Sequence, residues 1–195
     1  MTTGSEPIPH WPGRLVSVSD HGAGDHEVFV RSAPVPETDA EPALFVHGLE
    51  GSSRNWTDLI DLLRSRLACE AMDLPGFGDS PPRPDGRYSI AALAQSVTAL
   101  IQQQSEPVHL VGNSLGGWVA FELERRGRAR TLTGIAPAGG WSHFTPAKFE
   151  IVGKFLAGLP VWLTAKVLGQ KALRLPFARQ LASVPVSATA DGLSD

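Results

Sequence analysis

Short apolar runs alternate along the chain with longer segments in which apolar residues recur every third or fourth position. Runs of the first kind predict strands, and the recurring pattern predicts amphipathic helices. We expect six strands, at residues 14–20, 26–32, 43–47, 69–73, 108–112 and 131–138. We expect helices at residues 56–67, 90–101 (after the N-cap candidate Ser89) and 115–126. Strands that alternate with helices in this way are typical of an α/β sheet.

The first two predicted strands are separated only by residues 21–25, which include the glycine-containing stretch HGAG. A connection this short joins antiparallel strands, whereas parallel strands need a longer crossover that usually contains a helix. We therefore expect the sheet to begin with an antiparallel hairpin. Residues 1–13 contain no apolar run, so we interpret them as a disordered tail and not as a signal peptide.

The pattern changes after Gly140. Residues 144–182 are helical in pattern, apolar and lightly basic, with breaks at Pro160 and Pro176. We interpret residues 14–140 as the sheet core and residues 141–195 as an incomplete helical segment that would cap a site. The aromatic side chains of this segment would suit an apolar acyl or aromatic substrate. They are Trp141, Phe144, Phe155 and Trp162.

Composition narrows the classes of protein. The 195 residues are 42% hydrophobic, which is enough for one domain with a sizeable core. Seventeen basic residues against 20 acidic ones give a net charge of -3, which argues against a nucleic-acid partner. The single cysteine, Cys69, cannot form an internal disulfide, and the sequence has no metal-type Cys/His cluster. We therefore expect no metal, no cofactor, no membrane span, and a reducing cytoplasmic location.

One serine stands where a predicted strand ends and a predicted helix begins. The stretch Gly112-Asn113-Ser114-Leu115-Gly116 has the G-x-S-x-G spacing of a nucleophile elbow. A sharp strand-to-helix turn lifts the serine hydroxyl off the edge of the sheet, and only small neighbours fit around it. The free amides at the start of the following helix would then point toward an oxyanion formed there.

Three segments together resemble the N-terminal part of α/β-hydrolase-fold proteins: FVHGLEGSSRNW at 45–56, MDLPGFGDS at 72–80 and LVGNSLGG at 110–117. The resemblance covers roughly residues 14–140 and implies a mostly parallel sheet flanked by helices, C-terminally truncated, with a partial helical cap. It implies acyl transfer with Ser114 as nucleophile. It also implies an oxyanion hole formed by the backbone N–H groups of Leu49 and Leu115.

Four further residues are candidate substrate contacts: Asn113, His47, Glu50 and Trp141. For His47 the alternative interpretation is a packing and hydrogen-bonding role under the oxyanion loop. For Trp141 the expectation depends on a cap that folds over the site.

The resemblance places the triad acid and histidine on loops after the seventh and eighth strands. Downstream of Ser114 the sequence has one histidine, His143, and two aspartates, Asp191 and Asp195. All three come too early for those loops, so we expect neither triad partner in this chain. We expect the chain to be the N-terminal piece of a longer protein and to be inactive alone.

The leading hypothesis is a serine hydrolase that cleaves carboxylic esters of small-molecule substrates. A carbon–carbon bond hydrolase of the same fold and a non-catalytic α/β-hydrolase-like binding module remain as alternatives. Haloalkane dehalogenases and epoxide hydrolases of this fold need an aspartate nucleophile, so Ser114 argues against both activities. The oligomeric state is left open.

Overall fold

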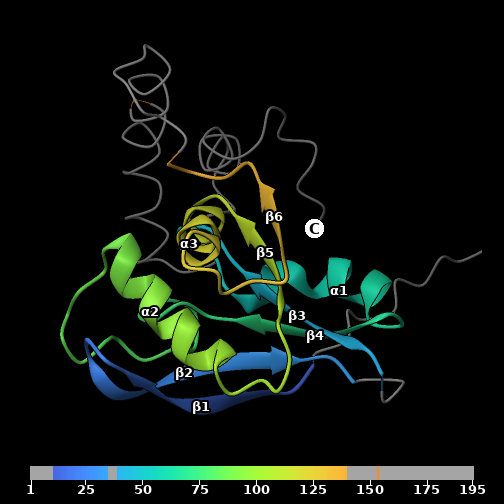
Figure 1. Ribbon diagram of the computed structural model, residues 1–195, viewed down its shortest axis with the longest axis horizontal. Coiled ribbons are helices and arrows are strands. Elements are labelled where there is room, and N and C mark those ends of the chain that lie inside the picture. The colour runs from blue at the N-terminus through green and yellow to red at the C-terminus, as the bar shows by residue number, and fades with distance from the viewer. Residues whose placement is uncertain (1–10, 35–38, 140–152, 154–195) are drawn as a thin grey trace, which may run out of the picture. The chain divides into compact units, whose positions relative to one another are not determined.

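A computed structural model describes residues 11–34, 39–139 and 153 of the chain. The described part contains one six-stranded sheet with the strand order β1-β2-β4-β3-β5-β6 (Figure 1). The strands are β1 Gly13–Asp20, β2 Gly24–Ser32, β3 Glu41–Val46, β4 Leu67–Met72, β5 His109–Asn113 and β6 Thr131–Ile135. The helices are the 3₁₀ turn η1 Ser53–Trp56, α1 Thr57–Leu63, α2 Ile90–Ile101 and α3 Leu115–Glu124.

The pairing confirms the predicted fold class. β1 pairs with β2 antiparallel, from Gly13 opposite Arg31 to Asp20 opposite Gly24, so the predicted hairpin forms. β2 then joins β4 antiparallel, and β4, β3, β5 and β6 run parallel to one another. Each parallel connection contains a helix, because a crossover must return the chain to the same edge of the sheet. The carboxyl ends of β3, β4, β5 and β6 therefore lie at one edge.

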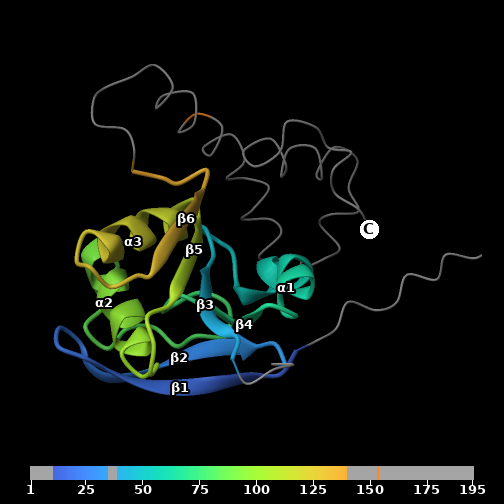
Figure 2. The same cartoon turned by 45° about the vertical axis from the view of Figure 1, so that its right-hand side comes forward.

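Helices cover both faces of this sheet. Figure 2 shows α1 on one side and α2 and α3 on the other. Along β3, Leu44 and Val46 pack in the core under α2 and α3, whereas Ala43 and Phe45 pack in the core under α1. A parallel strand that is buried on both faces reads as a continuous apolar run, which explains the ALFV pattern.

Several element boundaries differ from the predicted ones. β3 begins at Glu41 and includes Pro42, which is tolerated because pairing with β5 starts only at Ala43. α1 ends at Leu63 instead of residue 67, because Leu67 already pairs with Glu41 as the first residue of β4. Part of the predicted tail belongs to the fold, since Trp11 is buried and Gly13 is the first residue of β1.

The chain divides into two compact units, Met1–Gly140 and Trp141–Asp195. The helical cap predicted for residues 141–195, including Trp141, lies outside the described residues apart from Gly153, which is helical. Within the described residues, no helix is long and apolar enough to cross a membrane. The same part of the chain holds no group of three histidine, cysteine or acidic side chains that is arranged for a metal ion.

Candidate active site

Ser114 lies directly after β5 and is the N-cap residue of α3, as the elbow motif predicts. Its φ of 49° and ψ of -111° are unfavourable for a residue with a side chain, and such strain persists only where neighbours hold it. The neighbours are the end of β6 and the residues after it. The Ser114 N–H donates to the Ile135 carbonyl at 3.1 Å, and the Ser114 carbonyl accepts from Ala138 at 2.9 Å. The amide of Asn113 also donates to the Ile135 carbonyl, at 3.2 Å.

The two glycines of the elbow are required by close backbone approach. A Cβ at Gly112 would lie 2.4 Å from the Gly116 carbonyl oxygen. A Cβ at Gly116 would lie 2.2 Å from the carbonyl oxygen of Val46 and 2.5 Å from that of His47. These separations are far below van der Waals contact, which is about 3.5 Å or more for carbon. The start of α3 therefore packs directly against the end of β3.

The segment Gly48–Gly51 forms a tight turn after β3. Its closing hydrogen bond runs from the Gly51 N–H to the Gly48 carbonyl at 3.1 Å, and Glu50 at the third position has a φ of 59°. A positive φ at the third residue is the mark of a type II turn. Leu49, at the second position, is 55% exposed. A Cβ on Gly48 would lie 3.2 Å from the Ser114 Cβ, so this turn lies against the elbow. We call residues 48–51 the oxyanion turn, after the role that the sequence resemblance implies for Leu49.

The structure corrects the prediction that His47 contacts substrate. The side chain is only 1% exposed, and both ring nitrogens are hydrogen-bonded. Nδ1 lies 2.6 Å from the Gly48 carbonyl oxygen, and Nε2 accepts the Leu74 N–H at 2.9 Å. Burial lowers the pKa of His47 below its ordinary value, against opposing effects of the Gly48 carbonyl and the Asp73 carboxylate. The alternative interpretation, hydrogen bonding beneath the oxyanion turn, matches these contacts.

Asp73 is a structural residue whose full role sequence reasoning missed. It follows β4, and its carboxylate accepts the backbone N–H groups of Ser53 and Asp79. Asp79 in turn forms ion pairs with Arg31 and Arg54, each at 3.2 Å. The DLPGFGDS segment therefore ties the loop after β4 to η1. The only available signal was the motif itself, because Ser53 lies 20 residues upstream of Asp73.

Four predicted site residues remain: Leu115, Asn113, Glu50 and Trp141. Leu115 is the first residue of α3, where backbone N–H groups have no partner within the helix. Asn113 is half-buried between the oxyanion turn and the end of β6, and its side chain is used within the fold. Glu50 is exposed on the oxyanion turn, and Trp141 lies outside the described residues.

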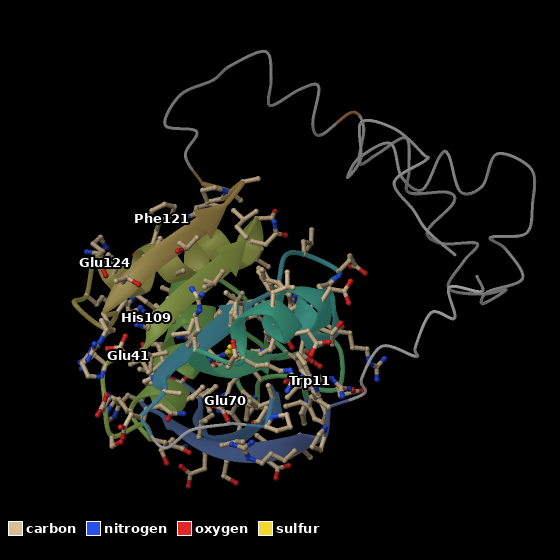
Figure 3. The ribbon with its side chains drawn as sticks, turned by 90° about the vertical axis from the view of Figure 1, so that its right-hand side faces the viewer. Trp11, Glu41, Glu70, His109, Phe121 and Glu124 are labelled. Atoms are coloured by element: carbon tan, nitrogen blue, oxygen red, sulfur yellow. The ribbon has the colours of Figure 1, made fainter. Side chains whose placement is uncertain are left out.

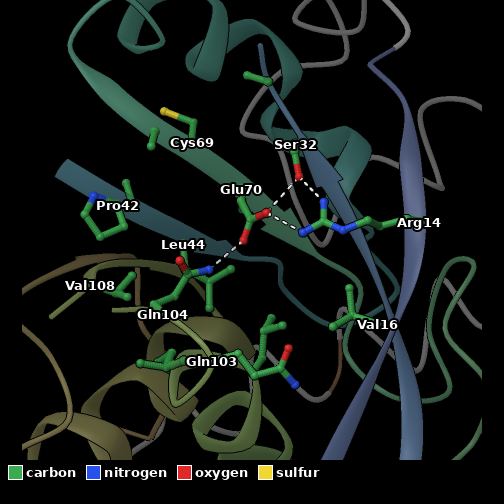
Figure 4. A pocket seen from close by; sticks show the side chains of 15 residues that line it. Arg14, Val16, Ser32, Pro42, Leu44, Cys69, Glu70, Gln103, Gln104 and Val108 are labelled. Atoms are coloured by element: carbon green, nitrogen blue, oxygen red, sulfur yellow. Dashed lines mark hydrogen bonds and ion pairs between the residues drawn. The ribbon is translucent and has the colours of Figure 1, made fainter. Parts of the chain in front are cut away.

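A cavity of about 410 Å³ lies at the other end of the sheet, among the first residues of the parallel strands (Figure 4). The Glu70 carboxylate on its wall accepts from Arg14 at 2.9 Å, Ser32 at 2.8 Å and Gln104 at 3.1 Å. At the same end, Glu41 lies 2.8 Å from Nε2 of His109 (Figure 3). These groups are separated from Ser114 by the length of β5, so neither cluster belongs to the candidate active site.

The alpha/beta hydrolase family model matches residues 43–194, and the chain belongs to this family. Epoxide hydrolase EphH of Mycobacterium tuberculosis is 60% identical over 108 residues, which cover 55% of this chain and 50% of that protein. Lipase 3 of Moraxella sp. is 30% identical over 148 residues, 74% of this chain and 45% of that one. The chain spans about half the length, or less, of the curated relatives it matches.

Solved structures show the same fold. A thermophilic esterase from Thermogutta terrifontis superposes with a TM-score of 0.61 at 20% identity, covering 92% of this chain and 69% of the esterase. A bacterial membrane phospholipase A superposes with a TM-score of 0.60 at 25% identity, covering 73% of this chain and 45% of that one. These likenesses support the fold described above.

Proposed function

We propose that the protein is a serine hydrolase that cleaves carboxylic esters through an acyl-enzyme on Ser114. The observation that carries the proposal is the contact between the strained elbow and the oxyanion turn, with Ser114 Cβ 3.2 Å from a Cβ position on Gly48. Ser114 Oγ would attack the ester carbonyl carbon, and the N–H groups of Leu49 and Leu115 would donate to the developing oxyanion. The alcohol then leaves with a proton, and water hydrolyses the acyl-enzyme.

A general base is also needed to take the proton from Ser114. Three of the histidines in the described ranges 11–34 and 39–139 are engaged elsewhere. His47 is buried with both nitrogens bonded, His26 is bonded to Gly24 and Ser96, and His109 is bonded at the amino end of β5. The fourth, His21, is exposed in the β1–β2 turn. We therefore assign the base to none of them.

Epoxide opening is the second candidate, because the 60% identical relative carries that name. The chemistry of the nucleophile opposes it. A carboxylate that opens an epoxide leaves an ester, which water hydrolyses in a second step. A serine hydroxyl would instead leave an ether on Ser114, which water does not cleave under these conditions. Ester cleavage is the reaction that returns Ser114 to its starting state.

The decisive experiment compares the complete gene product with two alanine variants. Ser114→Ala should abolish covalent labelling by a fluorophosphonate probe and lower kcat for p-nitrophenyl esters by at least about 10³-fold. The matched control is Ser105→Ala, an exposed serine in the loop before β5 at the opposite end of the sheet. It should leave both readouts unchanged.

An aryl epoxide is offered to the same three proteins in parallel. Labelling retained in Ser114→Ala would refute the nucleophile assignment. Epoxide turnover that depends on Ser114, without ester turnover, would make epoxide opening the proposed function in place of ester cleavage. Absence of both labelling and turnover in the wild-type protein would support the non-catalytic binding module.

A further inference from the structure

The two contacts of the His47 ring define its protonation state. A carbonyl oxygen can only accept, so Nδ1 carries a proton and donates it to Gly48 at 2.6 Å. A backbone N–H can only donate, so Nε2, which receives the Leu74 N–H at 2.9 Å, carries no proton. His47 is therefore held as the neutral imidazole, in one defined tautomer.

The partners of the ring are the two loops that flank the site. The Gly48 carbonyl that accepts from His47 also accepts the Gly51 N–H, which closes the oxyanion turn. Leu74 is the second residue of the loop after β4 and follows Asp73 directly. The imidazole therefore links the turn that presents the Leu49 N–H to a loop 27 residues downstream of His47.

We infer that His47 is a positioning residue: in its neutral form it clamps the oxyanion turn to the loop after β4, and a second proton on Nε2 opens that clamp. A proton on Nε2 would point at the Leu74 N–H, so a donor would face a donor and the hydrogen bond would be lost. The clamp itself rests on the contacts above. Its consequence for catalysis rests on the proposed function, because it assumes that Leu49 donates to an oxyanion.

The surroundings of the ring keep the clamp closed near neutral pH. Among the described residues, Asp73 is the charged group that acts on the ring, and its carboxylate already accepts two backbone N–H groups. The neighbours of His47 given by these contacts are uncharged: the Phe77 ring, whose centroid lies 5.6 Å from that of the imidazole, and Gly51 and Gly116, which lie close to the Cβ and the backbone carbonyl of His47. Burial outweighs the attraction of Asp73 and lowers the pKa of His47.

The sign of the pH effect follows from this lowered pKa. A released His47 would titrate near its ordinary value of 6.5, whereas the clamped ring titrates lower. The released state therefore binds more protons between these two values, and the clamp weakens as the pH falls below 6.5. Above 6.5 its full contribution is present.

The first test needs no enzyme activity. The complete gene product, labelled with ¹⁵N at its histidines, is titrated by NMR from pH 8 to pH 4. His47, identified by its loss in His47→Gln, should show a protonated Nδ1 and an unprotonated Nε2 at and above pH 6.5, and should take up its second proton only below that pH. Amide protection factors of Leu74 and Gly51 should fall by up to about tenfold for each pH unit below 6.5, because one proton is taken up on opening. The Ser80 amide, which donates to Phe77 in the same loop, is the internal control.

Two substitutions separate the two ends of the clamp. The amide oxygen of His47→Gln can take the place of Nε2 and accept from Leu74, and it cannot be protonated in this range. His47→Asn keeps a donor near the Nδ1 position but leaves the Leu74 N–H without its acceptor. Protection at Leu74 should be independent of pH in the first variant and low at every pH in the second. His109→Gln makes the same change in a histidine at the opposite end of the sheet and should behave as wild type.

Kinetics then connect the clamp to the site. His47→Asn should lower kcat for p-nitrophenyl esters by about 100-fold with little change in KM, as expected for a displacement of about 1 Å. His47→Gln should restore most of the lost kcat. The acid limb of its pH profile should depend on one proton fewer than that of the wild type. Uptake of a second proton by His47 near pH 6.5 with unchanged Leu74 protection would overturn the inference, as would wild-type kcat in His47→Asn. If no Ser114-dependent turnover is found at all, the proposed function fails, while NMR and exchange still decide the clamp.

Discussion

Substitution of Gly116 by alanine tests whether close backbone approach builds the elbow. The new Cβ would lie 2.2 Å from the Val46 carbonyl oxygen, 2.5 Å from that of His47 and 2.6 Å from the Val46 carbonyl carbon. All three atoms belong to the backbone of the chain at the end of β3, so no side-chain rotation can relieve the overlap. The start of α3 must instead move away from β3 by about 1 Å to restore ordinary contact.

The cost follows from this geometry. Overpacking in a core costs about 1–3 kcal/mol, and a clash with fixed backbone belongs at the upper end of that range. The higher helix propensity of alanine than of glycine offsets about 1 kcal/mol of this cost at most. We therefore expect Gly116→Ala to lower the free energy of unfolding by about 2 kcal/mol. For a chain of this size such a loss corresponds to a fall in Tm of about 4–8 °C.

Urea denaturation followed by tryptophan fluorescence measures the effect without any need for activity. The matched control is Gly134→Ala in β6, where the new Cβ would lie 3.3 Å from Pro137 and 3.5 Å from the Phe121 ring. The control should change the free energy of unfolding by less than about 1 kcal/mol. An unchanged midpoint in Gly116→Ala, or an equal loss in both variants, would refute the role assigned to the close approach.

Two further predictions concern the interior of the sheet domain. Burial raises the pKa of the Cys69 thiol to about 11. The native protein should therefore resist alkylation by iodoacetamide at pH 8 and react only in urea, as measured by intact mass. Rapid labelling of the native protein would contradict the burial of Cys69. Arg83 pairs with Asp20 at 2.6 Å with both side chains fully buried, so Arg83→Met should cost about 3–5 kcal/mol in chemical denaturation. Although burial opposes it, the Gly22 amide and Arg83 hold the pKa of Asp20 below 3.8, so this contribution is complete above pH 3.8 and is lost as the pH falls further. The stability gap between wild type and Arg83→Met should therefore narrow in acid, and a gap that widens there would contradict the pairing.

The sequence predicted the features that depend on local pattern. The apolar run before Gly112 and the helical pattern after it placed Ser114 at a strand-to-helix junction, and the short HGAG connection predicted the hairpin. The bounds of the elements were less accurate where pairing with a distant strand decides them. β6 ends at Ile135 because Ala136 has a φ of 42°, although the apolar pattern continues beyond it.

The contacts that shape the site could not be predicted from the local sequence pattern. The sequence suggests a substrate contact for His47 because this residue adjoins the oxyanion turn. Its acceptor role toward Leu74 depends on the pairing of β3 with β4, which brings residues 27 positions apart together. The same pairing brings the Asp73 carboxylate to the Ser53 N–H. A donor and an acceptor that only strand pairing brings together cannot be predicted from the spacing of residues within the motif.

The hydrogen bonds from the end of β6 to Ser114 have a consequence for the order of folding. The strained serine is held from one side by β3, through the packing at Gly116, and from the other by the Ile135 carbonyl. β3 precedes the elbow by more than 60 residues and β6 follows it, so a hairpin or a single strand-helix unit cannot hold this geometry. We expect the native conformation of Ser114 to arise only after three parallel strands have assembled, which makes Ser114 a late reporter of refolding.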